Sequence, residues 1–176
     1  MLISERVNKT INEQVGNEFG ASLQYIAIAS YFVTESLPEL AAHFHRQAEE
    51  EQAHAMRFVK FIAEAGGKVV IPPIAAPKSH FRSVEEAVKL SLEQEKNTSK
   101  QINRLVELAL KESDRATENF LQWFISEQFE EVSSMEKLLK MIQRAGESRL
   151  LYVETYLAGK GPSLGAASLS DKKSRS

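Results

Sequence analysis

The stretch Ala48-Glu49-Glu50-Glu51-Gln52-Ala53-His54 lies in the middle of a long run of residues that favours helix. Glu51 and His54 stand three residues apart, so on an α-helix both side chains project from one face. Phe44 and Phe58 stand seven residues before and after Glu51, which indicates that this face packs into the core. A buried carboxylate without a partner costs several kcal/mol. Glu51 is therefore expected to shift its pKa, to bind a cation, or not to be buried.

The spacing Glu51-x-x-His54 is one that helical bundles use to bind metal ions. Alone it is weak evidence, because Glu-x-x-His occurs by chance in many helices. A metal site requires further ligands, and the other helices have to supply them.

The chain of 176 residues has the composition of an ordinary soluble globular protein, with 43% hydrophobic and 26% charged residues. Its length fits one domain, or one domain plus a tail. The net charge of -2 gives no reason to expect nucleic acid or a membrane as a partner. The absence of cysteine leaves nitrogen and oxygen ligands for a metal, which favours ions such as iron. Without a signal-peptide pattern or an apolar run of about 18 residues, a cytoplasmic protein is expected.

The apolar periodicity predicts an all-α fold. Four long helices are expected over about residues 4–34, 37–65, 83–111 and 114–145, followed by a short amphipathic helix over 147–159. Ser36-Leu37-Pro38-Glu39 and Ser83-Val84-Glu85-Glu86 have the form of capping boxes with serine as the N-cap. Gly66-Gly67 and Gly146 stand where helices are expected to end. The apolar stripe predicted for the first helix contains Val7, Ile11, Val15, Ser22, Ile26 and Ala29.

Residues 68–82 are predicted to form a long connection, because they hold three of the five prolines and show no helical periodicity. At full extension this connection spans up to about 55 Å, which exceeds the length of a helix of about 30 residues. The other links are short. We therefore predict a four-helix bundle with one long crossover between the second and third helices. The domain is expected to cover residues 1–159, and residues 160–176 are expected to form a flexible tail.

Each of the four long helices carries one glutamate near its midpoint, in an apolar seam with seven-residue spacing. These residues are Glu18, Glu51, Glu95 and Glu131. A mid-helix position keeps its height whichever way the helix runs, so side-by-side packing brings all four carboxylates to one level. A single seam glutamate is more often an interface residue, but four at one level beside His54 predict a shared site.

Four carboxylates that meet in an apolar interior repel one another by several kcal/mol unless protons or metal ions intervene. Two divalent cations match the charge of the four glutamates, and His54 adds a neutral ligand. Oxygen-rich sites with one nitrogen suit iron or manganese, and a carboxylate such as Glu51 can bridge two ions. The sequence therefore predicts a dinuclear metal centre within one subunit.

Over about residues 4–159 the chain resembles the ferritins, most closely the haem-free prokaryotic type. The resemblance is carried by Asn17-Glu18 with Tyr25, by Glu50-Glu51-x-x-His54, by Leu92-Glu93-Gln94-Glu95 and by Phe120-Leu121-Gln122-Trp123-Phe124-Ile125-Ser126-Glu127-Gln128-Phe129-Glu130-Glu131. The last run is the most specific of these. The resemblance implies a ferritin-like bundle with a short fifth helix.

The resemblance also implies a ferroxidase centre of two iron ions. Glu18, Glu51 and His54 would hold the first ion, and the second would be held by Glu51, Glu95 and Glu131, with Gln128 beside it. A third iron site would be formed by Glu50, Glu127, Glu130 and Glu131. Tyr25 and Trp123 match aromatic residues that the family places near the centre.

Several of these residues have an ordinary structural interpretation as well. Tyr25 and Trp123 would be sensible core aromatics in any bundle. Glu49, Glu50 and Glu130 could form a solvated face. For these residues both interpretations stay open.

Haem is not expected, because two features of haem-containing bacterioferritins differ here. Those proteins carry a methionine just after the second-helix glutamate, whereas Gln52 follows Glu51 in this chain. They also repeat Glu-x-x-His on the fourth helix, whereas Glu131 is followed by Val132-Ser133-Ser134.

The function that the resemblance implies is iron storage with ferroxidase activity. Two Fe(II) ions would be oxidised by O2 or H2O2 and stored as a ferric oxyhydroxide mineral. One bundle cannot enclose a mineral, so the resemblance implies a homo-oligomeric cage of 24 subunits with the short fifth helix at the four-fold contacts. Two alternatives are a di-iron oxidase or peroxidase of the rubrerythrin kind and a metal-free structural bundle.

Overall fold

The computed structural model describes residues 2–160, and all its regular elements within that range are helical. They are α1 (Glu5–Thr34), α2 (Pro38–Glu64), α3 (Val84–Lys111), α4 (Arg115–Ala145), the 3₁₀ turn η1 (Glu147–Arg149) and α5 (Leu150–Lys160). These bounds confirm the four long helices and the short fifth one. Of the tail predicted for residues 160–176, Lys160 ends α5 and the others lie outside the described residues.

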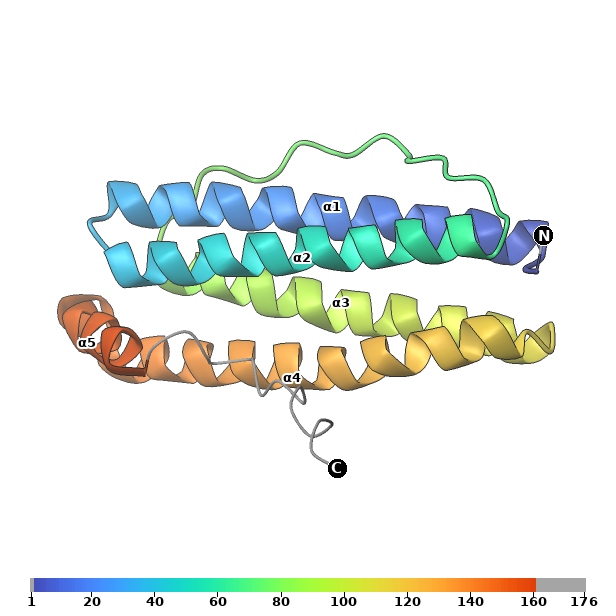
Figure 1. Ribbon diagram of the computed structural model, residues 1–176. Coiled ribbons are helices and arrows are strands. Elements are labelled where there is room, and N and C mark those ends of the chain that lie inside the picture. The colour runs from blue at the N-terminus through green and yellow to red at the C-terminus, as the bar shows by residue number, and fades with distance from the viewer. Residues whose placement is uncertain (1, 161–176) are drawn as a thin grey trace, which may run out of the picture.

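The four long helices lie side by side, and the segment between α2 and α3 runs along the outside of α1 from one end of the bundle to the other (Figure 1). The short links make α1 antiparallel to α2 and α3 antiparallel to α4, while α5 crosses one end of the bundle. This arrangement confirms the four-helix bundle with one long crossover. None of the described helices has the length and hydropathy needed to cross a membrane.

Side-chain caps begin three of the four long helices, as local sequence rules predict. Ser4 Oγ accepts from the backbone N–H of Val7 at 3.1 Å, and Ser83 Oγ accepts from the N–H of Glu86 at 3.1 Å. Asp114 opens α4 in the same way. At the other ends, Gly66 and Gly146 adopt positive φ angles of 71° and 67°, which confirms the predicted stops.

The start of α2 differs from the prediction, because Ser36 does not cap it. Ser36 adopts a φ of 60°, and Leu37 is the N-cap residue without a side-chain hydrogen bond. Glu154 of α5 supplies the missing acceptor, since its carboxylate accepts from the N–H groups of Glu39 at 2.8 Å and Leu40 at 2.9 Å. The expected capping box was therefore wrong, and a carboxylate more than a hundred residues away replaces it.

The crossover is fixed to α1 by side-chain hydrogen bonds and by one close approach. Gln24 exchanges two hydrogen bonds with the backbone of Lys78, at 2.8 and 2.9 Å. Gly16 lies under Pro72, where an added Cβ would come within 2.4 Å of the proline Cγ. Gly16 is therefore required by the packing of the crossover, a role that its position within a helical pattern does not reveal.

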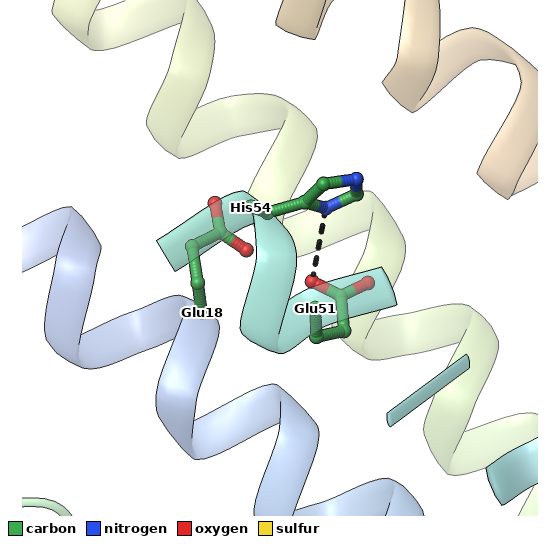
Figure 2. Close-up of side chains that lie close together, drawn as sticks. All are labelled: Glu18, Glu51 and His54. Carbon is green, nitrogen blue, oxygen red and sulfur yellow. Dashed lines mark ion pairs between the residues drawn. The ribbon is translucent and has the colours of Figure 1, made fainter. Parts of the chain in front are cut away.

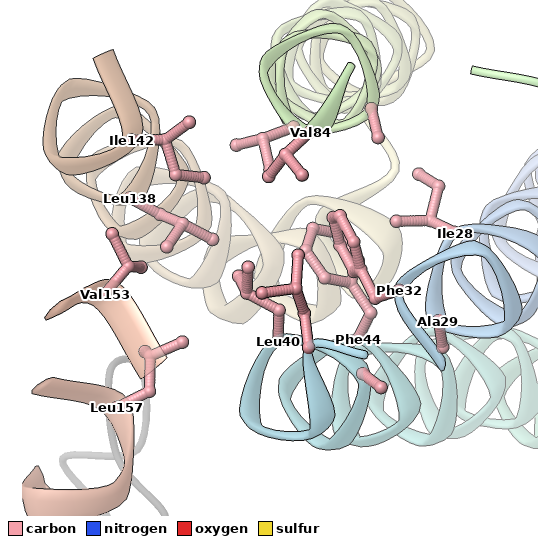
Figure 3. Close-up of a cluster of buried hydrophobic side chains, with 14 of the residues drawn as sticks. Ile28, Ala29, Phe32, Leu40, Phe44, Val84, Leu138, Ile142, Val153 and Leu157 are labelled. Carbon is pink, nitrogen blue, oxygen red and sulfur yellow. The ribbon is translucent and has the colours of Figure 1, made fainter. Parts of the chain in front are cut away.

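Two hydrophobic clusters fill the bundle, one toward each end. The first holds Phe32, Leu40, Phe44 and Leu138 and extends to Val153 and Leu157 of α5 (Figure 3). The second is built from the opposite halves of the same four long helices, with Ile11, Val15, Phe58, Ile62, Ile102, Leu121 and Phe124. Ile26 belongs to neither, because its side chain is 46% exposed, and its predicted place in the apolar stripe was wrong.

Candidate metal centre

The four seam glutamates occupy the layer that separates the two hydrophobic clusters. On every long helix the glutamate follows residues of one cluster and precedes residues of the other. Glu18, Glu51, Glu95 and Glu131 are all buried, with exposed fractions of 1%, 2%, 1% and 4%, and His54 is 4% exposed. The structure therefore brings the predicted acidic residues into one buried polar layer.

Glu18 of α1 meets Glu51 and His54 of α2, and we call these three residues the inner group (Figure 2). Each offers one ligand atom, and these atoms all lie within 4.8 Å of one another. His54 Nδ1 lies 3.4 Å from Glu51 Oε2. Among the described residues, Glu18 Oε2, Glu51 Oε1 and His54 Nδ1 are buried without a hydrogen-bond partner. Unpartnered polar atoms of this kind are rare in folded proteins, and a cation would satisfy all three.

A second set of ligand atoms lies between α2 and α4, and we call it the outer group. It consists of His54, Glu127 and Glu131, whose ligand atoms also lie within 4.8 Å of one another. Glu127 is half-buried, whereas the other two side chains are buried. His54 therefore belongs to both groups and links the inner layer to a more accessible position.

Glu95 is held differently, because hydrogen bonds engage both of its carboxylate oxygens. The phenol of Tyr25 donates to Oε1, and the amide of Gln128 donates to Oε2 at 3.1 Å. The Gln128 amide also lies 3.2 Å from the backbone oxygen of Glu95. Glu51, Glu95 and Glu131, predicted to hold a second ion, do not appear as one close group within the described chain.

The residues predicted for a third site are only partly gathered. Glu127 and Glu131 meet at the outer group. Glu50 is half-buried and accepts a hydrogen bond from the amide of Gln47, while Glu130 is exposed. Glu49 is exposed as well, which agrees with its interpretation as part of a solvated face.

Gln14 is a site residue that the sequence pattern did not reveal. Its amide donates to Glu18 Oε1 at 2.8 Å, and its own oxygen accepts from the amide of Asn17 at 3.2 Å. Gln14 stands four residues before Glu18 on α1, so the two side chains share a face. That spacing was the available signal, although it is common on helices without function.

Burial determines the protonation of the layer. Desolvation raises the pKa of Glu18 to about 7 and raises the pKa values of Glu51 and Glu131 well above their usual range, with neighbouring carboxylates adding to the shift for the latter two. Burial, with the nearby Arg57 charge, lowers the pKa of His54 to about 4, so its imidazole is neutral at pH 7. At neutral pH the layer therefore contains carboxyls that favour the protonated form, beside a neutral imidazole whose lone pair can bind a cation.

Aromatic rings of α4 pack against His54. Trp123 packs edge to face against the imidazole at a centroid distance of 5.4 Å, and Phe124 does so at 5.9 Å. Tyr25 is fully buried and contacts Phe44 edge to face at 5.6 Å. Both predicted aromatics therefore lie at the polar layer and also pack as core residues.

A comparison with protein families matches residues 8–145 to the ferritin-like domain. Among curated proteins, the ferritin BfrB of Mycolicibacterium smegmatis is 40% identical over 164 residues, which cover 93% of this chain and 90% of the relative. The bacterial non-heme ferritin of Staphylococcus aureus (strain USA300) is 34% identical over 153 residues, which cover 86% of this chain and 92% of the relative.

Solved structures give the same result for the fold. An open pore ferritin from the archaeon Archaeoglobus fulgidus superimposes with a TM-score of 0.87 at 34% identity, covering 89% of this chain and 97% of that one. A humanized archaeal ferritin superimposes with a TM-score of 0.86 at 35% identity, covering 89% of this chain and 96% of that one. From the family match, the curated relatives and the shared bundle, the chain belongs to the ferritin family of iron-storage proteins, within its prokaryotic branch.

Proposed function

We propose that this ferritin oxidises Fe(II) in the buried polar layer before the iron is stored. The observation that supports the proposal is the inner group, where ligand atoms of Glu18, Glu51 and His54 lie within 4.8 Å of one another and each residue has a buried polar atom without a hydrogen-bond partner. Carboxylate oxygens with one imidazole nitrogen suit ferrous iron. Membership of the ferritin family indicates iron as the substrate, and the burial of the layer keeps bulk water away from the ions.

Two Fe(II) ions are the substrates, and each gives up one electron. One O2 molecule takes up these two electrons and two protons and leaves as H2O2, or H2O2 replaces O2 as the oxidant. Because burial raises the carboxyl pKa values, the glutamic acids release protons when the cations bind. The chain therefore holds the ions close together, and the carboxyls of Glu18 and Glu51 give up their protons when the ions bind.

In this proposal Glu18, Glu51 and His54 hold the first ion. The second would be held by Glu51, Glu95 and Glu131, with Gln128 beside it. Each Glu95 oxygen accepts one hydrogen bond, from Tyr25 or Gln128, and keeps a second lone pair for the cation. A third ion would use Glu131 and Glu127 together with Glu50 and Glu130. Tyr25 would orient Glu95 through its hydrogen bond.

Storage requires an enclosed space, so we infer that the chain assembles into a homo-oligomeric cage of 24 copies. The exposed apolar side chains of Leu151 and Tyr152 on α5, 73% and 74% exposed in the single chain, are suited to a contact between copies. A cytoplasmic location and an absence of haem stay predictions.

The test is aerobic addition of Fe(II) to the purified protein, followed by ferric absorbance and by elution size. Wild-type protein is expected to oxidise Fe(II) faster than buffer, and Glu51→Gln should slow it at least about tenfold because a ligand to the inner group is lost. The control is Glu93→Gln, which neutralises an exposed carboxylate on α3. Oxidation no faster than buffer, in a small oligomer, would contradict the proposal and favour a metal-free bundle.

A further inference from the structure

The positively charged side chain of Arg57 lies at one end of a column of polar side chains between α2 and α4. The column is formed on α2 by His54 and Arg57 and on α4 by Trp123, Glu127 and Glu131, each spaced by three or four residues so that they share a face. The two helices are antiparallel, so Arg57 meets Trp123 while His54 meets Glu127 and Glu131. The Arg57 side chain is exposed and therefore stands at the mouth of the column.

The Arg57 guanidinium is held in place by a ring. Its Cζ lies 3.6 Å from the centroid of Trp123, which is the geometry of a cation–π contact. The same indole packs against the imidazole of His54 at 5.4 Å. Within the described chain, Arg57 forms no ion pair with Glu127.

The Arg57 charge acts on the outer group from this position. The guanidinium lies on the face of Trp123, the same indole packs against His54, and His54 shares the outer group with Glu127 and Glu131. A divalent cation bound among these three residues would therefore be repelled by the positive charge of Arg57.

We propose that the positive charge of Arg57 lowers the affinity of the outer group for metal cations, so that ions pass through this group instead of remaining there. The inference deepens the proposed function, since it assumes that iron reaches the outer group on its way between the inner group and the mineral. The charge of Arg57 sets the affinity, and its stacking on Trp123 fixes where that charge lies.

The experiment measures binding of Zn(II) to the full chain in its native assembly by calorimetry. Arg57→Gln removes the charge and is expected to tighten binding at the outer group by roughly tenfold. Arg57→Lys keeps the charge and should stay within about threefold of wild type, because an ammonium group can also lie over the indole face of Trp123. Arg57→Met, a second neutral variant that keeps an apolar stem over the ring, should behave as Arg57→Gln does.

Two controls separate this effect from a general change in charge. Lys60→Gln removes a positive charge one turn further along α2, where Lys60 pairs with Glu64, and should leave Zn(II) affinity unchanged. Glu127→Gln removes a member of the outer group, so adding Arg57→Gln to it should produce no further change. Trp123 is the only tryptophan, so its fluorescence reports cation binding beside it.

Equal Zn(II) affinity in the wild type and both neutral variants would overturn the proposal. A tightening that persists in the Glu127→Gln background, or that Lys60→Gln reproduces, would overturn it as well. Zn(II) is not oxidised, so this titration is independent of ferroxidase activity. A chain that fails to oxidise Fe(II) but shows the Arg57 effect would contradict the proposed function alone.

Discussion

Glu18 shows how burial makes a proton or a cation part of the folded state. Its pKa is raised to about 7 by desolvation, so the folded chain holds a proton that the unfolded chain has released. A group with a raised carboxyl pKa loses its stabilising contribution as the pH rises from the unfolded to the folded pKa. His54 and His43 have the opposite effect on stability. Burial lowers both of their pKa values to about 4, so the unfolded chain binds protons there that the folded chain does not, and their contribution to stability increases as the pH rises toward the usual histidine pKa.

The metal-free protein is therefore expected to lose stability between pH 6.5 and pH 8. In that window His43 and His54 are still partly protonated in the unfolded chain, and their gain of about 0.4 kcal/mol each offsets a Glu18 loss of about 1 kcal/mol. The net loss comes from Glu51 and Glu131, whose pKa values are raised well above the usual range, so the folded chain holds protons there that the unfolded chain has released. Thermal unfolding with a chelator at several pH values measures the trend. Glu18→Gln should make the curve less steep, Glu51→Gln should do the same, and saturating Zn(II) should abolish the trend in the wild type. Stability that rises from pH 6.5 to pH 8 without metal would contradict this sign.

The sequence predicted the burial of the four seam glutamates and of His54, because seven-residue spacing is a property of each helix alone. It did not predict the burial of His43 and Glu154. It did not reveal Gln14 or the contact between Arg57 and Trp123. Those contacts depend on which rotamers neighbouring side chains adopt, and helical spacing allows many such pairs without selecting one. The pattern thus identifies candidate ligands better than the residues that orient them.

At the level of helices, Glu154 joins α5 to the start of α2. The N-terminus of a helix leaves backbone N–H groups unsatisfied, and the carboxylate of Glu154 accepts from two of them. The prediction from Ser36 failed because capping rules consider only neighbouring residues. A cap that arrives from α5 depends on the complete fold.

Glu154→Ala is expected to destabilise the protein by about 1–2 kcal/mol and to loosen the contact between α5 and α2. Chemical denaturation gives the free energy, and hydrogen exchange of the Glu39 and Leu40 amides reports the loss of the cap. Glu147→Ala, an exposed carboxylate in η1, provides the matched control and should change stability by less than about 0.5 kcal/mol. Unchanged exchange at Glu39 and Leu40 would show that Glu154 does not cap α2 in solution.

Gly16 and Gly20 stand four residues apart on α1, and the crossover makes them unequal. A Cβ on Gly16 would lie 2.4 Å from Pro72 Cγ, whereas the nearest atom to a Cβ on Gly20 is Ile74 Cγ2 at 3.7 Å. Gly16→Ala should therefore destabilise the protein by about 1–3 kcal/mol through displacement of the crossover. Gly20→Ala should be neutral or stabilise it by up to about 1 kcal/mol, because alanine favours helix. Equal melting temperatures for the two variants would contradict the close packing of the crossover on α1.

The whole bundle consists of two apolar ends joined by a polar layer, and the two parts contribute differently to stability. The end clusters bury large side chains such as Phe32, Phe44, Phe58 and Phe124. The middle layer buries carboxyls that would be less costly as neutral groups. The sequence predicted a polar level between apolar residues because each seam carries one glutamate near its midpoint, with apolar residues on both sides. It did not predict that His54 joins Glu127 and Glu131 in the outer group, since that depends on the distance between α2 and α4.

Replacing Glu18, Glu51, Glu95 and Glu131 together by glutamine should therefore stabilise the metal-free protein at pH 8, by about 1–4 kcal/mol. Wild-type protein should regain stability with Zn(II), by about 3 kcal/mol at a hundredfold excess over the dissociation constant, because the metal binds the folded state. The variant should lose most of that gain, together with Fe(II) oxidation. Melting temperatures with and without Zn(II), at equal protein concentration, measure both effects. A variant that melts below the metal-free wild type would contradict this prediction, because the four carboxyls would then stabilise the bundle themselves. The polar layer would in that case be a structural feature and not a site that destabilises the metal-free fold in favour of metal binding.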